Sequence, residues 1–380
     1  MTKKISKYVA GIVFSAASFA LAFMVTPALA SASETATDGN GITWEYDVAE
    51  SGSGIQIKLS DSGLPSTLRG KVTLPSTLNG EIVTELGNDA FYNNEDVTEV
   101  TFSSSITSVG SCAFQYCSNL KAITWDASLI ESVGETAFSG CKKLESLTLP
   151  TNSNFTVIPD NMLYECEKIS TLVIPAQIYK INSYAFSGSG VTNAVLPDTL
   201  TSLGANLFND CDKLISIQLP SNSDITTIPE GLCKSCPALK SVNIPEGYDT
   251  ISNSAFSYSA LVGITLPSTI TSIEDSVFYD CESMQFVQFT SPAVPSFSGE
   301  SQFKYATSMF KVFCPAGTES LYQTSMADAA NTLGLPEKTS FVGKSEKVTT
   351  IPVLSGEITV TGTLTVGTPT VSYTHLHFPQ

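Results

Sequence analysis

Short groups of apolar residues recur along most of the chain, alternate with polar residues and end at proline. Residues 214–220, Leu-Ile-Ser-Ile-Gln-Leu-Pro, are one example: Ile217 and Leu219 are apolar, whereas Ser216 and Gln218 are polar. Alternation with period two is typical of a half-buried β-strand, and proline ends the strand because it has no N–H to donate. A second apolar pair follows each proline. The pattern therefore predicts a short strand and a return segment that also contacts the core.

The same pattern repeats every 22–25 residues. Each unit resembles Leu-Gly-x-x-Ala-Phe-x-x-Cys-x-x-Leu, and ten units are present. Their Phe position is held by Phe91, Phe114, Phe138, Leu163, Phe186, Phe208, Cys233, Phe256, Phe278 and Phe303. No single unit can bury its own apolar side chains, so stacked neighbours must form a continuous core. The sequence predicts a β-rich α/β solenoid of about ten repeats. In each repeat, the Phe segment, such as residues 206–210, should be a one-turn helix or 3₁₀ turn.

A longer period of 70 residues lies on top of the short one. Residues 141–210 and 211–280 align without gaps, with 26 identities in 70 positions. Duplication of a three-repeat block explains this match most simply. It favours a modular scaffold, because a catalytic site does not have to be built twice.

The N-terminus has the pattern of an export signal. Lys3, Lys4 and Lys7 precede an apolar run over residues 8–25, and Ala28-Leu29-Ala30 is a small-x-small cleavage site. These are the three parts of a secretory signal peptide, and an uncleaved membrane anchor is the alternative. Residues 1–30 are therefore expected to direct the protein out of the cell, to the cell surface or the medium.

Charge and composition exclude several function classes. Lys and Arg number 19 against 36 Asp and Glu, a net charge of −17, which disfavours a nucleic-acid partner. The two histidines, His375 and His377, lie in the last six residues, so Ser-His-Asp catalysis, Cys-His catalysis and His-ligated metal are excluded from residues 1–374. Phosphate-binding, calcium-binding and nucleophile-elbow motifs are missing from the sequence. We therefore expect no enzyme activity, cofactor or metal.

Cysteines and glycines occupy fixed positions in the repeats. Six of the nine cysteines stand three residues after the Phe position: Cys117, Cys141, Cys166, Cys211, Cys236 and Cys281. Cys233 and Cys236 have the spacing of a redox or zinc motif, but the repeat register predicts that both point inward as small hydrophobic side chains. We call the six the ladder cysteines, and whether neighbours among them form disulfides is left undecided by the sequence. Gly87, Gly110, Gly134 and Gly204 are expected to satisfy turn geometry before the Phe.

The outward positions of the predicted strands are the natural binding surface, because stacked strands form an extended sheet. Most of these positions carry small polar residues, and exposed apolar groups among them would mark contact sites. The alternative is that they are ordinary β-compatible residues with no ligand. The candidate binding residues are Thr148, Val173, Val195, Gln218, Asn243, Thr265, Phe286 and Gln288.

The repeats resemble the BspA-like leucine-rich-repeat family of secreted and cell-surface proteins. The resemblance rests on residues 181–186 and 203–214, on the start at residues 41–48, on residues 74–91 and on the closing segment 314–322. It implies a leucine-rich-repeat superhelix with N-terminal and C-terminal caps. It also implies surface display and adhesion to host extracellular-matrix glycoproteins.

These observations define an expected organisation and function. The parts are a signal peptide (1–30), a linker (31–40), an N-terminal cap (41–84), the repeats (85–315), a C-terminal cap (316–345) and a linker with a truncated or artefactual tail (346–380). We expect an exported, non-catalytic and monomeric adhesion module that binds an extracellular protein, glycoprotein or glycan through its strand face. Two alternatives are a targeting module of a larger exported enzyme, suggested by an unfinished β-pattern in residues 351–366, and a structural cell-wall or surface-layer spacer.

Overall fold

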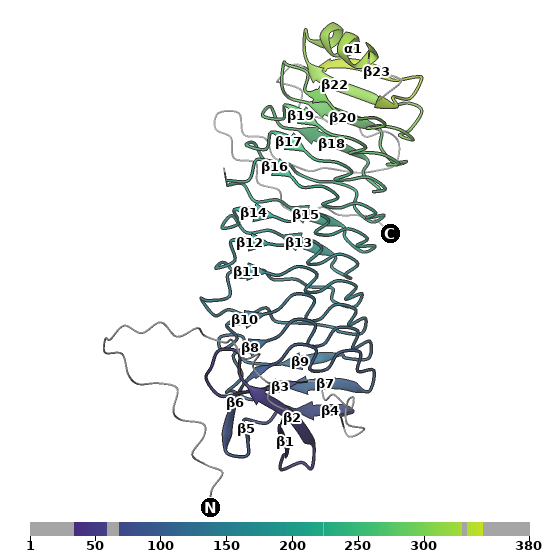
Figure 1. Cartoon of the computed structure of the whole chain (residues 1–380). Helices are drawn as coiled ribbons and strands as arrows, with labels where there is room; N and C mark the ends of the chain where they lie inside the picture. The colour runs from purple at the N-terminus through teal and green to yellow at the C-terminus, as the bar shows by residue number, and fades with distance from the viewer. Residues whose placement is uncertain (1–33, 59–67, 223, 329–332, 345–380) are drawn as a thin grey trace, which may run out of the picture. The chain divides into compact units, whose positions relative to one another are not determined.

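The computed structural model describes residues 34–58, 68–222, 224–328 and 333–344. The expected signal peptide and the C-terminal tail lie outside these residues. Within them, the compact unit that begins at Thr35 is a β-solenoid of about eleven turns with almost no helix (Figure 1). No helix in the described part of the chain is long and apolar enough to cross a membrane.

One side of the solenoid is a stack of short parallel strands in three hydrogen-bonded groups. The isolated bridges from Ala122 to Ser146 and from Gln218 to Asn243 extend the same register beyond the strands. We call the solvent side of this stack the strand face. Its strands are β4 (Gly70–Thr73), β7 (Val97–Thr101), β9 (Ala122–Thr124), β13 (Asn193–Val195), β15 (Ser216–Gln218), β18 (Gly263–Leu266), β20 (Phe286–Phe289), β22 (Lys311–Pro315) and β23 (Ser340–Lys344).

A second stack of parallel strands forms another side of each turn (Figure 1). Most of its strands have two residues, of which the second is a buried Ile or Val. Ile158 pairs with Ile181, and Ile228 pairs with Ile251, so identical residues repeat along the core. The strands are β6 (Glu81–Leu86), β8 (Ser108–Val109), β10 (Ser132–Val133), β11 (Val157–Ile158), β12 (Lys180–Ile181), β14 (Ser202–Leu203), β16 (Thr227–Ile228), β17 (Thr250–Ile251), β19 (Ser272–Ile273) and β21 (Ser296–Phe297).

The two ends of the array differ from the repeats between them. At the N-terminal end, β2 (Thr43–Val48) and β3 (Ile55–Lys58) are antiparallel, and β3 joins β6. Strand β1 (Glu34–Thr37) lies beside β2, and β5 (Thr77–Leu78) pairs with β6. At the C-terminal end, helix α1 (Glu319–Asp328) lies between β22 and β23 in the sequence. Its Tyr322 is buried, and the hydroxyl donates to the Ser291 carbonyl oxygen at 2.7 Å.

The Phe segments are turns: the expected one-turn helix is not found there, and the alternative, a 3₁₀ turn, agrees with i+3 hydrogen bonds such as that from Tyr92 to Asp89. We call these segments the turn edge: residues 89–93, 112–116, 136–140, 161–165, 184–188, 206–210, 231–235, 254–258, 276–280 and 301–305. In the first of them, the Phe91 N–H donates to the Ala113 carbonyl of the next repeat at 2.7 Å, whereas the Tyr92 N–H donates to Asp89 in its own repeat.

Left-handed residues explain why the turn edge is not helical. Asp89 and Asn93, two residues before and after Phe91, have φ of 57° and 56°, and the same two positions have positive φ in all ten segments. An α-helix needs negative φ and directs every N–H to its own segment. In the turn edge, every second backbone N–H is instead donated to a carbonyl of the neighbouring repeat. The turn edge is therefore a third inter-repeat ladder beside the two strand stacks.

The Phe side chains form stacks inside the solenoid. Phe114 lies between Phe91 and Phe138, with ring centroids 5.1 and 5.4 Å apart and nearly parallel rings. Phe186 stacks on Phe208, and Phe278 lies between Phe256 and Phe303. All of these rings are fully buried. The stacks are interrupted where Leu163 and Cys233 replace Phe, at two positions one 70-residue period apart.

The recurrent glycines are required by close packing of neighbouring backbones, and this reason differs from the expected one. Gly110, Gly134 and Gly204 do not have positive φ. A Cβ atom at Gly134 would lie 2.3 Å from the Ser111 nitrogen, and one at Gly204 would lie 2.3 Å from the Ser183 nitrogen. Both distances are far below van der Waals contact, so any side chain would push two repeats apart.

Replacing Gly204 by alanine should therefore destabilise the solenoid. We expect Gly204→Ala to lower the free energy of unfolding by about 1–3 kcal/mol, the usual cost of overpacking. Gly39→Ala is the matched control, because its Cβ would meet no atom within 4 Å and its φ is not positive. Urea unfolding followed by circular dichroism measures both. Equal stability of the two variants would contradict the close-packing explanation.

Candidate binding face

The structure places the eight candidate binding residues in or beside the outward rows of the strand face. Strand pairing puts Val195 opposite Gln218, and the next bridge puts Gln218 opposite Asn243. Thr265 lies opposite Gln288 in the same way. Six of the eight side chains are exposed: Thr148, Val173, Val195, Gln218, Asn243 and Thr265. The other two, Phe286 and Gln288, are half-buried.

Two exposed valines are the most unusual feature of this face. Val173 is 74 % exposed and Val195 is 58 % exposed, and they occupy consecutive repeats. Alternation explains their position, because Ala194 and Leu196 on either side of Val195 point into the core. Both valines leave apolar surface in water, where it is available to a partner.

The C-terminal end of the strand face is already occupied by contacts within the chain. The Phe286 ring lies over Gly263, whose missing side chain leaves room for it, and contacts Phe313 edge to face at 5.7 Å. Lys344 places its Nζ atom 4.0 Å from the Phe313 ring centroid and donates to the Gln288 side chain at 2.8 Å. Burial lowers the pKa of Lys344. Phe286 and Gln288 therefore contact Phe313 and Lys344 within the chain. They are less available to a partner than the six exposed candidates.

Sequence reasoning missed Phe313 and Lys344. Phe313 pairs with Gln288 and so has the register of the outward row, but its ring is itself buried. The alternation of Lys311, Val312 and Phe313 was the available signal. Lys344 reaches Phe313 from β23, and no repeat pattern predicts that strand.

The ladder cysteines have a structural role that the sequence did not reveal. The Cys117 thiol donates to the Phe91 carbonyl at 3.0 Å, and Cys141 donates to Phe114 at 3.1 Å. The equivalent bonds are made by Cys166, Cys211, Cys236 and Cys281. The thiols are buried, but they act as hydrogen-bond donors as well as small apolar groups. They give a second donor to carbonyl groups at the turn edge, such as that of Phe91, which also accepts the Asn94 N–H at 3.0 Å.

Burial also sets the chemistry of these thiols. All nine cysteines lie in the described residues as free thiols. Desolvation raises the pKa of Cys117 and of Cys211 to about 12. It also raises the pKa of Cys233, in the Cys-x-x-Cys pair, well above its usual value. A thiol held protonated is a poor nucleophile and a poor metal ligand, and the described residues contain no cluster of three or more His, Cys, Asp or Glu placed to hold a metal.

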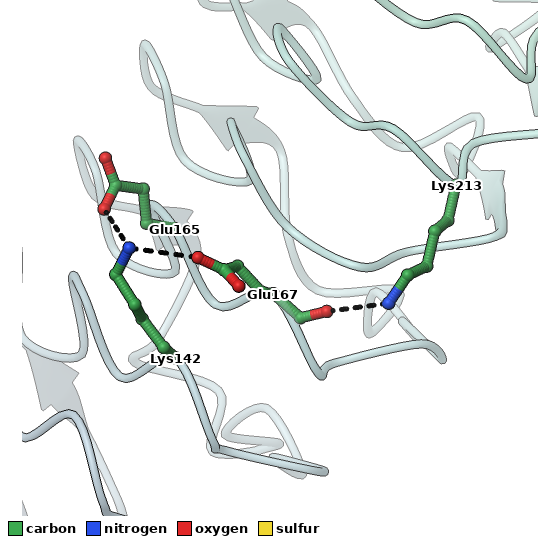
Figure 2. Close-up of polar contacts among 4 residues, drawn as sticks. All are labelled: Lys142, Glu165, Glu167 and Lys213. Atoms are coloured by element: carbon green, nitrogen blue, oxygen red, sulfur yellow. Dashed lines mark hydrogen bonds and ion pairs between the residues drawn. The ribbon is translucent and has the colours of Figure 1, made fainter.

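Charged side chains connect repeats at the corner between the turn edge and the strand face (Figure 2). Lys142 lies between two carboxylates of the next repeat, 3.4 Å from Glu165 and 3.0 Å from Glu167. Lys213 reaches back across the intervening repeat and donates to the Glu167 carbonyl at 3.2 Å. In the intervening repeat, Gly190 lies against the Glu167 carbonyl. Because glycine has no side chain, the Lys213 side chain can reach this carbonyl. These pairs are exposed and contribute little stability, but they hold the lysines in place.

Comparison with known proteins identifies what this chain resembles. A family model described as "BspA type Leucine rich repeat region" with six copies matches residues 84–214, 156–285 and 226–335, which together cover more than half of the chain. No curated protein matches.

Several solved structures are similar to the chain. A leucine-rich repeat protein from Bacteroides ovatus is 20 % identical, over 79 % of this chain and 98 % of that one, with a TM-score of 0.42. The pneumococcal vaccine antigen PcpA is 15 % identical, over 82 % and 99 %, with a TM-score of 0.44. A leucine rich cell surface protein from Faecalibacterium prausnitzii is 21 % identical, over 67 % and 94 %, with a TM-score of 0.33.

Proposed function

The chain belongs to the BspA-type leucine-rich-repeat family, and we propose that it is an exported, non-catalytic recognition module for an extracellular protein or glycoprotein. The exposed pair Val173 and Val195 carries the proposal. Two adjacent apolar side chains in a polar row form the kind of contact that a partner covers and desolvates.

The surroundings of the valine pair support the same function. Asn193, exposed on the strand of Val195, accepts a hydrogen bond from the Ser216 hydroxyl at 2.7 Å. Gln218 and Asn243 continue the row beside Val195 with amide groups that both donate and accept hydrogen bonds. An apolar centre with amides and hydroxyls around it resembles the core and rim of a protein interface. The parallel ladders hold these side chains at fixed spacing, so little order is lost on binding.

The export step of the proposal rests on the N-terminal residues. Residues 1–30 have the basic, apolar and cleavage-site segments of a signal peptide. Their structure lies outside the described residues. N-terminal sequencing of the protein recovered from its native host tests this step. The mature chain should begin at residue 31, after Ala28-Leu29-Ala30, or at residue 33, after a second small-x-small triplet, Ala30-Ser31-Ala32.

A binding screen with two substitutions tests the strand face. Full-length protein is measured against immobilised matrix glycoproteins, a glycan array and purified cell wall at physiological salt. We expect saturable binding to a protein or glycoprotein, weakened at least about tenfold by Val173→Asp or Val195→Asp, because each buries a charge in an apolar contact. Both variants should unfold within about 0.5 kcal/mol of the parent, as surface substitutions do.

Val48 provides the matched control for this experiment. It is a valine of similar exposure, 63 %, and lies on β2 away from the strand face. Val48→Asp should leave binding unchanged. Equal weakening by Val48→Asp, or full binding by Val195→Asp, would contradict a site at the valine pair. Binding to cell wall alone would favour the spacer alternative.

A further inference from the structure

Three tyrosines from consecutive repeats form a row on the turn edge, a different surface from the strand face. The ring centroids of Tyr258 and Tyr279 lie 5.4 Å apart, and those of Tyr279 and Tyr305 lie 5.5 Å apart, in edge-to-face contact. Tyr258 is 45 % exposed and Tyr305 is 53 % exposed. The Tyr258 N–H donates to the Tyr279 carbonyl at 2.8 Å, so the turn ladder fixes the spacing of the rings. Ordered tyrosines present a large contact area at a low cost in side-chain entropy.

A cation of the chain itself already uses these rings. The Lys304 ammonium lies 5.2 Å from the centroid of the Tyr305 ring and 5.9 Å from that of Tyr279. Lys304 is exposed, and its ammonium group contacts the ring faces. The ring faces of tyrosine attract cations electrostatically. The geometry of the row is therefore suitable for a positively charged group.

Acidic residues lie in and next to the turn segments that carry the row. Asp280 occupies the position of Tyr258 and Tyr305 in the intervening repeat, and its N–H donates to the Lys304 carbonyl at 2.9 Å. Just before two of these turn segments, the Glu300 N–H donates to the Asp275 carboxylate at 2.6 Å, which brings two further acidic residues together. Desolvation is the main cause that raises the pKa of Tyr279, followed by the neighbouring Tyr305 and Tyr258 and then by Asp280. The whole chain adds a net charge of −17.

We propose that Tyr258, Tyr279 and Tyr305, together with Asp280, are a docking surface for an extended, arginine- or lysine-rich segment of a partner protein. A guanidinium group of the partner stacks on a tyrosine face and pairs with the Asp280 carboxylate. Charge decides between this occupant and a neutral glycan. Both the acidic surroundings and the position of Lys304 favour a cation, whereas a sugar gains nothing from either.

Peptide binding to the full chain tests the surface. The probe is a blocked eight-residue peptide of alternating arginine and glycine, measured by isothermal titration at physiological salt. Its control contains citrulline, which has the shape of arginine without the charge. We expect the arginine peptide to bind at least about tenfold more tightly. Tyr258→Leu, Tyr305→Leu and Asp280→Asn should each weaken it about 3- to 10-fold, the range of a cation–π or exposed charge contact. Tyr184→Leu, at an exposed tyrosine elsewhere on the turn edge, should have no effect.

Lys304 gives the sharpest test, because it competes for the same rings. Lys304→Ala should strengthen arginine-peptide binding about 3- to 10-fold. Lys338→Ala removes the same charge from an exposed site outside the row and should change binding less than about twofold. Equal binding of the citrulline peptide, no loss in Tyr258→Leu, or equal effects of the two lysine variants would overturn the proposal. Val173→Asp should leave this binding intact, so failure here and failure of the strand face are distinguishable.

Discussion

Raising the pH from 8 to 10 should cost the protein about 3 kcal/mol of stability through two buried thiols alone. The pKa of Cys117 and that of Cys211 are raised from 9.0 to about 12, chiefly because burial removes water from the thiolate. Each pKa unit between the unfolded and the folded value corresponds to about 1.4 kcal/mol. Because a domain has only about 5–15 kcal/mol of net stability, this loss is a large fraction of the total.

The sign of the effect follows from which state binds the proton more tightly. The folded state keeps these thiols protonated, whereas the unfolded chain releases the protons near pH 9. The stability is fully present below pH 9 and is lost as the pH rises through 9 toward 12. Cys141, Cys166 and Cys233 have raised pKa values from the same cause and act in the same direction. We therefore expect cooperative alkaline unfolding at a pH where the polypeptide is chemically intact.

Serine substitutions separate this effect from general repulsion at high pH. Serine keeps a hydrogen-bond donor for the Phe carbonyl but does not titrate in this range. Urea unfolding under reducing conditions should show that the Cys117→Ser, Cys211→Ser double variant loses about 3 kcal/mol less than the parent between pH 8 and pH 10. Cys112→Ser is the control, because the Cys112 thiol is only half-buried. If the double variant and the parent lose stability equally, the buried thiols do not govern the alkaline transition.

The repeat pattern was sufficient to predict the strands and the core, because both depend on side-chain period. Ile217 and Leu219 are buried and Gln218 is exposed, as the alternation in residues 214–220 predicts. The one-turn helix expected at the turn edge is not found, because the conformation of this segment is set by backbone geometry. Asp89 and Asn93 tolerate positive φ, but Tyr116 and Glu165 occupy the same positions, so the sequence carries no consistent left-handed signature.

Only part of the candidate site could be predicted from the alternation of inward and outward residues along the strands. Alternation predicts that Val173 and Val195 point outward, and they do. It does not predict that the Phe286 ring covers Gly263, because that contact depends on the absence of a side chain one repeat away. Tyr258, Tyr279 and Tyr305 were missed for a related reason. Tyr279 stands one residue after its Phe and the other two stand two residues after theirs, so no single repeat position marks the row.

Phe114→Ala should be among the most damaging single substitutions in the core, costing about 3–5 kcal/mol of unfolding free energy. The Phe114 ring is fully buried and stacks on both sides, against Phe91 and Phe138. Phe208 is equally buried but stacks on Phe186 alone, because Cys233 fills the Phe position of the next repeat. A stacked ring pair contributes about 0.5–1.5 kcal/mol beyond its buried area. Phe208→Ala should therefore cost about 1 kcal/mol less than Phe114→Ala.

The position of the two tryptophans makes this prediction measurable repeat by repeat. Trp44 contacts Phe91, and Trp125 contacts Phe138, so tryptophan fluorescence reports on the repeats around Phe114, whereas circular dichroism reports on the whole array. Since the core of each repeat packs mainly on its immediate neighbours, Phe114→Ala should shift the fluorescence transition in urea to lower concentration than the dichroism transition. Phe114→Leu is the matched control, because Leu163 fills the same position naturally, and it should cost less than Phe114→Ala. If the fluorescence and dichroism transitions of Phe114→Ala coincide, coupling between repeats extends beyond nearest neighbours. If Phe114→Ala and Phe208→Ala lower the free energy of unfolding equally, ring stacking makes no contribution.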